Sequence, residues 1–230
     1  MLSRTPVTQS VARKIQAMIM SGELKPGEKV PSQRVFSETL KVSRASLREA
    51  LLTLEAIGLL RTEPGRGTFV SPDRSADSRH MARWRYSDSY PVTDVFQTRI
   101  MLEGQIAGLS ANLISEAEIQ QLEVETDNME RHWETGNLLA NVEADLEFHL
   151  IIASACPNRM LVDLYNSVRD RLTATQIQPI PITEPARMRD SIGEHKRIIA
   201  SLRRRDAEAA VQDMESHIRN TARCAGIKLP

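Results

Sequence analysis

The chain has 230 residues, with 30 Lys plus Arg balanced by 30 Asp plus Glu. No apolar run reaches the roughly 20 residues that span a membrane, and no apolar signal-peptide core follows the first residues, so we expect a cytoplasmic protein with no membrane partner. The two cysteines, Cys156 and Cys224, form no C-x-x-C pair and indicate free thiols rather than a disulfide framework.

The charges are unevenly distributed along this neutral chain. Residues 1–72 carry 11 Lys and Arg against 6 Asp and Glu, whereas residues 73–230 carry 19 against 24. A basic N-terminal segment followed by an acidic remainder suggests contact with nucleic acid at one end of the chain.

The N-terminal segment has the pattern of three short helices. Apolar residues at helical spacing predict a first helix over 8–21. Ser32 can cap a second helix that ends near Leu40, and Ser43 can cap a third. In this third helix Arg44 and Arg48 point away from the apolar stripe, as in a recognition helix that meets base edges and phosphates.

A hairpin is predicted directly after these helices. Residues 59–63 and 67–70 flank a turn of Pro64, Gly65 and Arg66, which is typical of a wing with a basic tip that reaches a minor groove. The alternative, a small helical domain with a solvated basic face, leaves the hairpin unexplained. The order of helices and hairpin therefore predicts a winged helix-turn-helix domain over residues 8–71.

These motifs resemble the GntR family of bacterial regulators over nearly all of residues 8–71. In that family the matching residues contact operator DNA, which implies this role for Arg34, Ser43, Arg44, Ser46, Arg48 and Gly65. Lys41 stands where the family usually has a glycine, so we expect it to contact a phosphate or to take a left-handed conformation at some cost. The matching motifs are Pro26-Gly27, Pro31-Ser32-x-Arg34, Val42-Ser43-Arg44-x-Ser46-Leu47-Arg48-Glu49-Ala50-Leu51, Leu54, Gly58-Leu59 and Gly65-x-Gly67-x-Phe69-Val70.

Residues 72–91 are polar, lack a sustained period and are predicted to form a linker. Trp84 lies among several arginines in this linker, which suggests a short connecting helix whose indole packs on the second domain; an extra DNA contact is the alternative.

The remainder, residues 92–225, is predicted to be entirely helical. Six amphipathic segments pack best as an antiparallel bundle, so the fold class is mainly α. Ser115 and Glu118 form a predicted capping box, and prolines mark the longest break between segments. The expected helices span about 92–112, 115–136, 138–155, 158–177, 184–204 and 206–225.

Polar residues on the apolar faces of these helices indicate a buried site. Asp145 and His149, four residues apart, share one face of a mostly apolar helix. His195 and His217 are each in phase with apolar residues of later helices. Three histidines and an aspartate that all face inward predict a metal site with three nitrogens and one oxygen, for a divalent ion such as Zn, Ni or Mn.

Arg99 is in phase with the apolar stripe of its own helix, which includes Phe96, Ile106 and Leu109. A guanidinium that faces a core needs an anion. Either Glu103, one turn further on, pairs with it internally, or Arg99 holds the carboxylate of a bound ligand.

The bundle resembles the FCD effector domain that accompanies many GntR regulators, and six helices suggest the VanR-like branch of the FadR subfamily. The resemblance implies that Asp145, His149, His195 and His217 bind the metal and that Arg99 contacts a small carboxylate effector. It also implies a homodimer.

We therefore expect a ligand-responsive, DNA-binding transcriptional regulator, a repressor of an organic-acid operon, and not an enzyme. Three alternatives remain. The metal itself could be the signal, the polar cluster could pair internally without metal, or an open metal site could activate water in a hydrolase.

Overall fold

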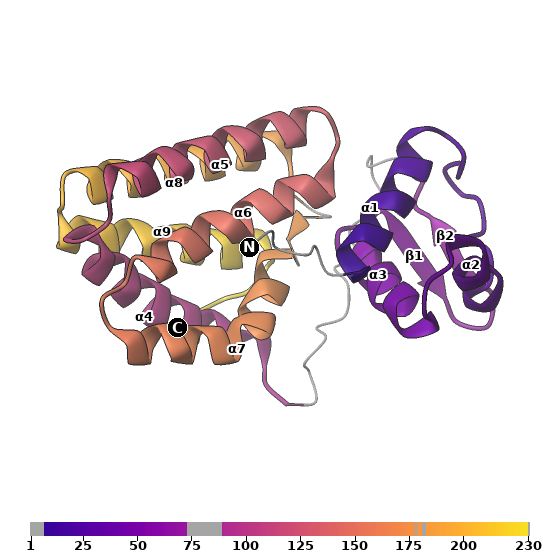
Figure 1. Ribbon diagram of the computed structural model, residues 1–230, viewed down its shortest axis with the longest axis horizontal. Coiled ribbons are helices and arrows are strands. Elements are labelled where there is room, and N and C mark those ends of the chain that lie inside the picture. Colours follow the sequence, from indigo (N-terminus) through magenta and orange to yellow (C-terminus); the bar gives the residue numbers. More distant parts are fainter. Residues whose placement is uncertain (1–6, 73–88, 178, 181–182, 230) are drawn as a thin grey trace. The chain divides into compact units, whose positions relative to one another are not determined.

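The computed structural model describes residues 7–72, 89–177, 179–180 and 183–229 (Figure 1). Contacts between residues divide the chain into two compact units, residues 1–82 and 83–230. Within the described ranges, no helix is long and apolar enough to cross a membrane. The predicted linker helix around Trp84 lies outside the described residues.

The first unit is the predicted winged helix-turn-helix. Helix α1 packs on α3, α2 and α3 form the helix-turn-helix, and the two strands pair antiparallel with Leu60 opposite Val70. The core is apolar and includes fully buried Ile15, Leu47 and Leu54. The elements are α1 (Val7–Met20), α2 (Gln33–Leu40), α3 (Arg44–Ala56), β1 (Leu60–Glu63) and β2 (Gly67–Val70).

Side-chain caps start the two helices of the helix-turn-helix. Ser32 Oγ accepts a hydrogen bond from the Val35 backbone N–H, and Ser43 Oγ accepts one from the Ser46 N–H. Lys41 ends α2 with φ +56° and ψ +47°. A lysine thus takes the left-handed conformation that usually favours glycine, which was one of the two expectations for this position.

The second unit is the predicted helical bundle, and its six described helices begin and end within a few residues of the expected positions. Helix α4 packs along α9 and against α7, while α5 packs along α6 and α8 (Figure 1). Ser115 and Glu118 form the predicted capping box. The helices are α4 (Val92–Ala111), α5 (Glu116–Glu134), α6 (Leu138–Ser154), α7 (Arg159–Ile177), α8 (Pro185–Arg203) and α9 (Ala207–Cys224).

Two glycines allow α4 and α9 to approach closely. A Cβ atom added at Gly108 would lie 2.6 Å from Val211 Cγ2 and 3.1 Å from the Ala207 carbonyl oxygen. A Cβ at Gly104 would lie 3.0 Å from Cγ of Glu215. Because α4 carries Arg99 and α9 carries His217, this contact sets the spacing between two walls of the polar cluster.

We predict that Gly108→Ala destabilises the protein. Helix propensity favours alanine by about 1 kcal/mol, but overpacking against Val211 and a backbone carbonyl costs roughly 1–3 kcal/mol, so we expect a net loss. Urea unfolding measures the change. Gly193→Ala in α8 is the matched control, because the nearest atom is Arg197 Nη1 at 3.7 Å, and it should be neutral or stabilising. A Gly108→Ala variant as stable as Gly193→Ala would contradict the close-approach argument.

Candidate functional site

The exposed face of α3 carries the residues predicted to read DNA. Arg44 and Arg48 are exposed in the first two turns, and Ser46 is half-buried. Ser43 is already used as the cap, with its Oγ 3.0 Å from the Ser46 backbone nitrogen and 2.9 Å from the Ser46 Oγ. The two arginines are therefore the groups of α3 that are free to reach base edges and phosphates.

Arg34 and the wing supply further basic groups. Arg34 Nη1 lies 3.6 Å from Glu38 Oε1, and both side chains are exposed, so this ion pair is weak. Gly65 forms the hairpin turn with φ +74°. Arg66 beside it is 72% exposed, pairs with Glu63 and lies over the ring of Phe69. The predicted basic tip is thus present, although its guanidinium has partners within the wing.

The structure brings together the four residues predicted to bind a metal. Asp145 and His149 come from α6, His195 from α8 and His217 from α9, and one potential ligand atom from each lies within 4.8 Å of the others. The three imidazoles are buried and Asp145 is half-buried. Such a group in a bundle core requires either internal partners or a cation.

The hydrogen bonds of His195 limit those possibilities for this residue to a shared proton or a metal ion. Its Nδ1 lies 2.8 Å from the Ser191 carbonyl oxygen, which can only accept, so Nδ1 carries the proton. In the neutral ring Nε2 then has a lone pair, and it lies 3.1 Å from Oδ1 of Asp145. Two acceptors at this distance repel each other unless a proton or a metal ion lies between them. Two ligands bound about 2.1 Å from one ion lie roughly 3 Å apart, which matches.

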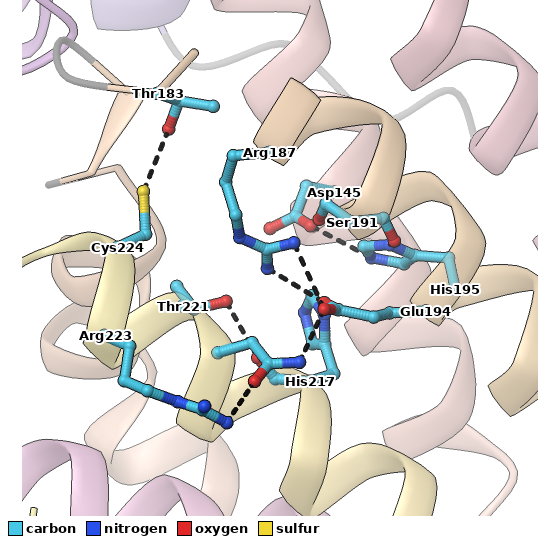
Figure 2. A network of polar contacts seen from close by, with 11 residues as sticks. Asp145, Thr183, Arg187, Ser191, Glu194, His195, His217, Thr221, Arg223 and Cys224 are labelled. Carbon is cyan, nitrogen blue, oxygen red and sulfur yellow. Dashed lines mark hydrogen bonds and ion pairs between the residues drawn. The ribbon is translucent and has the colours of Figure 1, made fainter. Parts of the chain in front are cut away.

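His217 is oriented by a carboxylate on the neighbouring helix. Its Nδ1 donates to Glu194 Oε2 at 2.8 Å, so Nε2 is left to face the cluster. Glu194 also accepts two hydrogen bonds from Arg187, at 3.1 and 2.9 Å, and one from Asn220 at 2.6 Å (Figure 2). Metal-binding histidines commonly have such an outer carboxylate.

His149 has a carboxylate neighbour too. Its Nδ1 lies 2.6 Å from Glu103 Oε2, but the ring N–H is not aligned for a hydrogen bond, so the contact is electrostatic. His149 Nε2 has no hydrogen-bond partner among the described residues, although the ring is buried. A buried imidazole nitrogen without a hydrogen-bond partner is available to bind a metal ion.

Glu103 also pairs with Arg99, so the internal partner considered for this arginine is present. Arg99 Nε donates to Glu103 Oε1 at 2.7 Å and Nη1 donates to Thr175 Oγ1 at 3.2 Å. Arg99 is fully buried, and its Nη2 has no partner within the described part of the chain. The guanidinium therefore keeps one donor for a ligand.

Charges hold the buried acids ionised. Burial alone would raise the pKa of Glu103, but Arg99 and His149 outweigh it and lower the pKa to about 2. Burial likewise opposes the ionisation of Glu194, yet His217 and Arg187 bring its pKa to about 2. Burial alone would raise the pKa of Asp145, but its hydrogen-bonding contact with His195 and the nearby His149 outweigh it and hold the pKa well below its usual range. Burial lowers the pKa of His217 to about 4, so this imidazole is neutral at pH 7 and able to bind a metal.

A cavity of about 50 Å³ opens onto the cluster. Arg99, Asp145 and His217 line it together with residues that the sequence did not single out. Among those are Arg187 and Gln176, whose Nε2 donates to Asp145 Oδ2 at 3.0 Å. The cavity joins the cluster, two guanidinium groups and several hydroxyl and amide groups in one space.

Sequence reasoning missed Arg187, Glu194 and Gln176. A signal for the first two existed, because residues seven apart lie on one face of a helix, two turns from each other. Gln176 has no such signal, since it contacts Asp145 from a helix 31 residues away in sequence.

Comparisons with known proteins agree with both units. Residues 7–70 match the gntR family of bacterial regulatory proteins, and residues 94–220 match the FCD domain. The chain belongs to the GntR family. It is a DNA-binding transcriptional regulator with an effector-binding FCD domain, not an enzyme.

The chain matches transcriptional regulators over most of their length. The chain is 29% identical to the Uxu operon transcriptional regulator of Escherichia coli K12, over 92% of this chain and 84% of that protein. It is 30% identical to the transcriptional regulator LutR of Bacillus subtilis, over 88% and 94%. Among solved structures, E. coli McbR/YncC matches with a TM-score of 0.53 at 19% identity, over 94% and 95%, which supports the shared fold.

We predict that Glu103→Leu strongly destabilises this GntR regulator. It leaves the guanidinium of Arg99 buried without its anion, and breaking a buried pair costs on the order of 3–5 kcal/mol. Thermal or urea unfolding measures the loss. Glu130→Gln is the control, because Glu130 pairs with Lys196 at 3.5 Å on the surface of the same bundle and should change stability very little. Similar stability of the two variants would refute the role of Glu103.

Proposed function

We propose that this GntR regulator is a repressor that binds operator DNA as a homodimer and leaves it when a small organic acid binds to a divalent metal ion in the FCD domain. Arg44 and Arg48 would read bases in the major groove, and Arg34 and Ser46 would hold phosphates or base edges. Gly65 and Arg66 would enter the minor groove. Ser43 contributes by fixing the first turn of α3.

The metal proposal rests on the contact between His195 and Asp145. Nδ1 of His195 already donates to a carbonyl, so the 3.1 Å approach of Nε2 to a carboxylate oxygen requires a proton or a metal ion between the two atoms, and we propose the metal ion. Asp145, His149, His195 and His217 would hold the ion, and an ion with three nitrogen ligands and one oxygen suits Zn, Ni or Mn. When bound, it would offer open positions to oxygen atoms of the effector.

Arg99 would hold the carboxylate of the effector together with the metal. Its unpartnered Nη2 supports this proposal, as does its place in the wall of the cavity. The internal pair with Glu103 does not exclude it, because that pair uses Nε and the bond to Thr175 uses Nη1, which leaves Nη2 for a ligand.

Effector binding can change operator affinity only by favouring one state of the protein over another. The relatives include both kinds of regulator: the Glc operon transcriptional activator of E. coli K12 is 27% identical, and the transcriptional repressor NanR of Enterobacter is 24% identical. We propose that this chain acts as a repressor.

An apolar surface on α4 and α7 supports the homodimer. Leu109 was expected in the core, but it is 39% exposed, and Met101 on the same helix is 71% exposed. Leu113 just beyond α4 and Met160 and Leu164 on the adjoining α7 are at least half exposed. Exposed apolar residues on two packed helices are typical of a protein interface.

We predict that Arg48→Ala weakens operator binding by about 1–3 kcal/mol, since it removes a base contact that a bidentate arginine makes. Fluorescence anisotropy with the operator and with unrelated DNA at the same salt concentration measures the change. Arg131→Ala is the control, because it removes the same charge from an exposed site on α5. Equal operator affinity of wild type and Arg48→Ala would refute the recognition role of α3.

We predict that wild-type protein contains one divalent metal per chain and that Asp145→Asn loses it. A chelator should lower the melting temperature by about 5–10 °C, because a tight ligand stabilises the folded state by a few kcal/mol. Organic acids should raise it only in metal-loaded wild type. His132→Ala is the control for a histidine outside the cluster and should retain metal.

The same measurements separate the alternatives. Stoichiometric metal in neither wild type nor Asp145→Asn means that the cluster pairs internally. Operator release on addition of metal alone, without any acid, makes the metal the signal.

A further inference from the structure

Five charged side chains surround the polar cluster and its cavity. Arg99, Glu103 and Glu194 have side chains at most 4% exposed, while Asp145 and Arg187 are 20–22% exposed. Two arginines and three carboxylates sum to one negative charge. Three of the five are sequestered from water and the other two are mostly so, so the net charge of the group should be balanced nearby, because an uncompensated buried charge is costly.

The salt bridges show which charge remains uncompensated. Arg99 pairs with Glu103 at 2.7 Å, and Arg187 pairs with Glu194 at 2.9 Å. Asp145 has no arginine or lysine partner among the described residues; its neighbours are the imidazole of His195 and the amide of Gln176. Its charge is therefore the one left over.

A divalent metal ion reverses this balance. Imidazoles that bind a metal through Nε2 are neutral, so the ion adds two positive charges to one negative. The loaded site carries one net positive charge. A single carboxylate neutralises that charge, whereas a dicarboxylate leaves one negative charge in a partly desolvated cavity.

The rest of the wall fits hydroxyl groups. Thr183 and Thr221 donate their hydroxyl protons to backbone carbonyls at 2.8 and 3.0 Å, so their oxygens remain available as acceptors. Asn141 donates to the Met129 carbonyl, and Gln176 donates to Asp145, which leaves the amide oxygens of both as acceptors. All four residues line the cavity, and acceptors of this kind match hydroxyl donors on a ligand.

We propose that the metal-loaded cavity selects a singly charged hydroxy acid and rejects the matching diacid, because the five fixed charges and the ion leave one positive charge to neutralise. This inference rests on the proposed metal-dependent effector site and names its ligand class. Glu194 sets the selectivity as a positioning residue: its carboxylate balances the charge of Arg187 and orients His217 without touching the ligand.

Two ligand series of constant carbon number test the proposal. Glycerol, glycerate and tartronate carry charges of zero, one and two on three carbons, and glucitol, gluconate and glucarate do so on six. Isothermal titration of the zinc-loaded full chain gives the dissociation constants. In at least one series we expect the monoacid to bind at least tenfold more tightly than both the alcohol and the diacid.

Glu194→Gln tests the charge argument directly. The amide oxygen can still accept a hydrogen bond from His217, but the site gains one positive charge. The affinity for the diacid should therefore rise at least tenfold relative to the affinity for the monoacid. Glu103→Gln adds the same charge beside Arg99 and should shift the ratio of diacid to monoacid affinity in the same direction. It serves as the test if Glu194→Gln does not bind zinc. Glu130→Gln changes an exposed carboxylate paired with Lys196 and should leave the ratio unchanged.

The outcomes distinguish the proposed charge selection from the proposed effector site on which it rests. Binding of mono- and diacids with equal affinity to wild type, or an unchanged ratio in zinc-loaded Glu194→Gln and Glu103→Gln, overturns the charge selection and leaves the effector site standing. Binding of no acid in either series to zinc-loaded wild type overturns the organic-acid effector itself, and the charge selection with it.

Discussion

The carboxylate of Glu103 lies between a buried guanidinium and a buried imidazole, and the bundle core is built around this contact. Arg99 on α4 is fully buried. Burial of its charge is tolerated because the carboxylate of Glu103 lies one turn away on the same helix. The other oxygen of Glu103 faces His149 on α6, so one carboxylate ties the arginine to the histidine cluster. The sequence suggests two separate sites, an arginine that binds a carboxylate and a cluster that binds a metal. Glu103 contacts both, so the two sites adjoin.

The three histidines of the cluster differ in how they are held. His217 has a carboxylate at Nδ1, His195 has a backbone carbonyl, and His149 has a carboxylate that is close but not aligned. Each arrangement leaves Nε2 for the centre of the cluster, as outer partners do for metal ligands. His149 is the least constrained of them, so its ring would adjust most to an ion.

Helical periodicity predicts most of the fold and part of the site. Asp145, His149, His195 and His217 could be singled out because each interrupts an apolar face, and burial of an imidazole or carboxylate is unusual enough to be informative. Glu194 shares a helix face with Arg187, seven residues earlier, but its role toward His217 could not be predicted, because that contact joins α8 to α9. Leu109 shows the opposite failure: periodicity places it in the core, yet it is exposed on a face that the isolated chain does not cover. The spacing of residues along one helix predicts which of them share a face, but it does not predict which other helix or chain that face contacts.

The close approach of α4 and α9 at Gly104 and Gly108 affects how displacement travels through the bundle. Long side chains between two helices can change rotamer and so accommodate a small shift of either backbone. At Gly104 and Gly108 no α4 side chain lies in between, and Glu215 and Val211 pack directly against the α4 backbone. A pull on His217 must therefore move α4 together with α9 instead of being absorbed between them. The outer side of α4 bears exposed Met101 and Leu109, so a displacement of α9 at the buried cluster would also displace this part of the bundle surface.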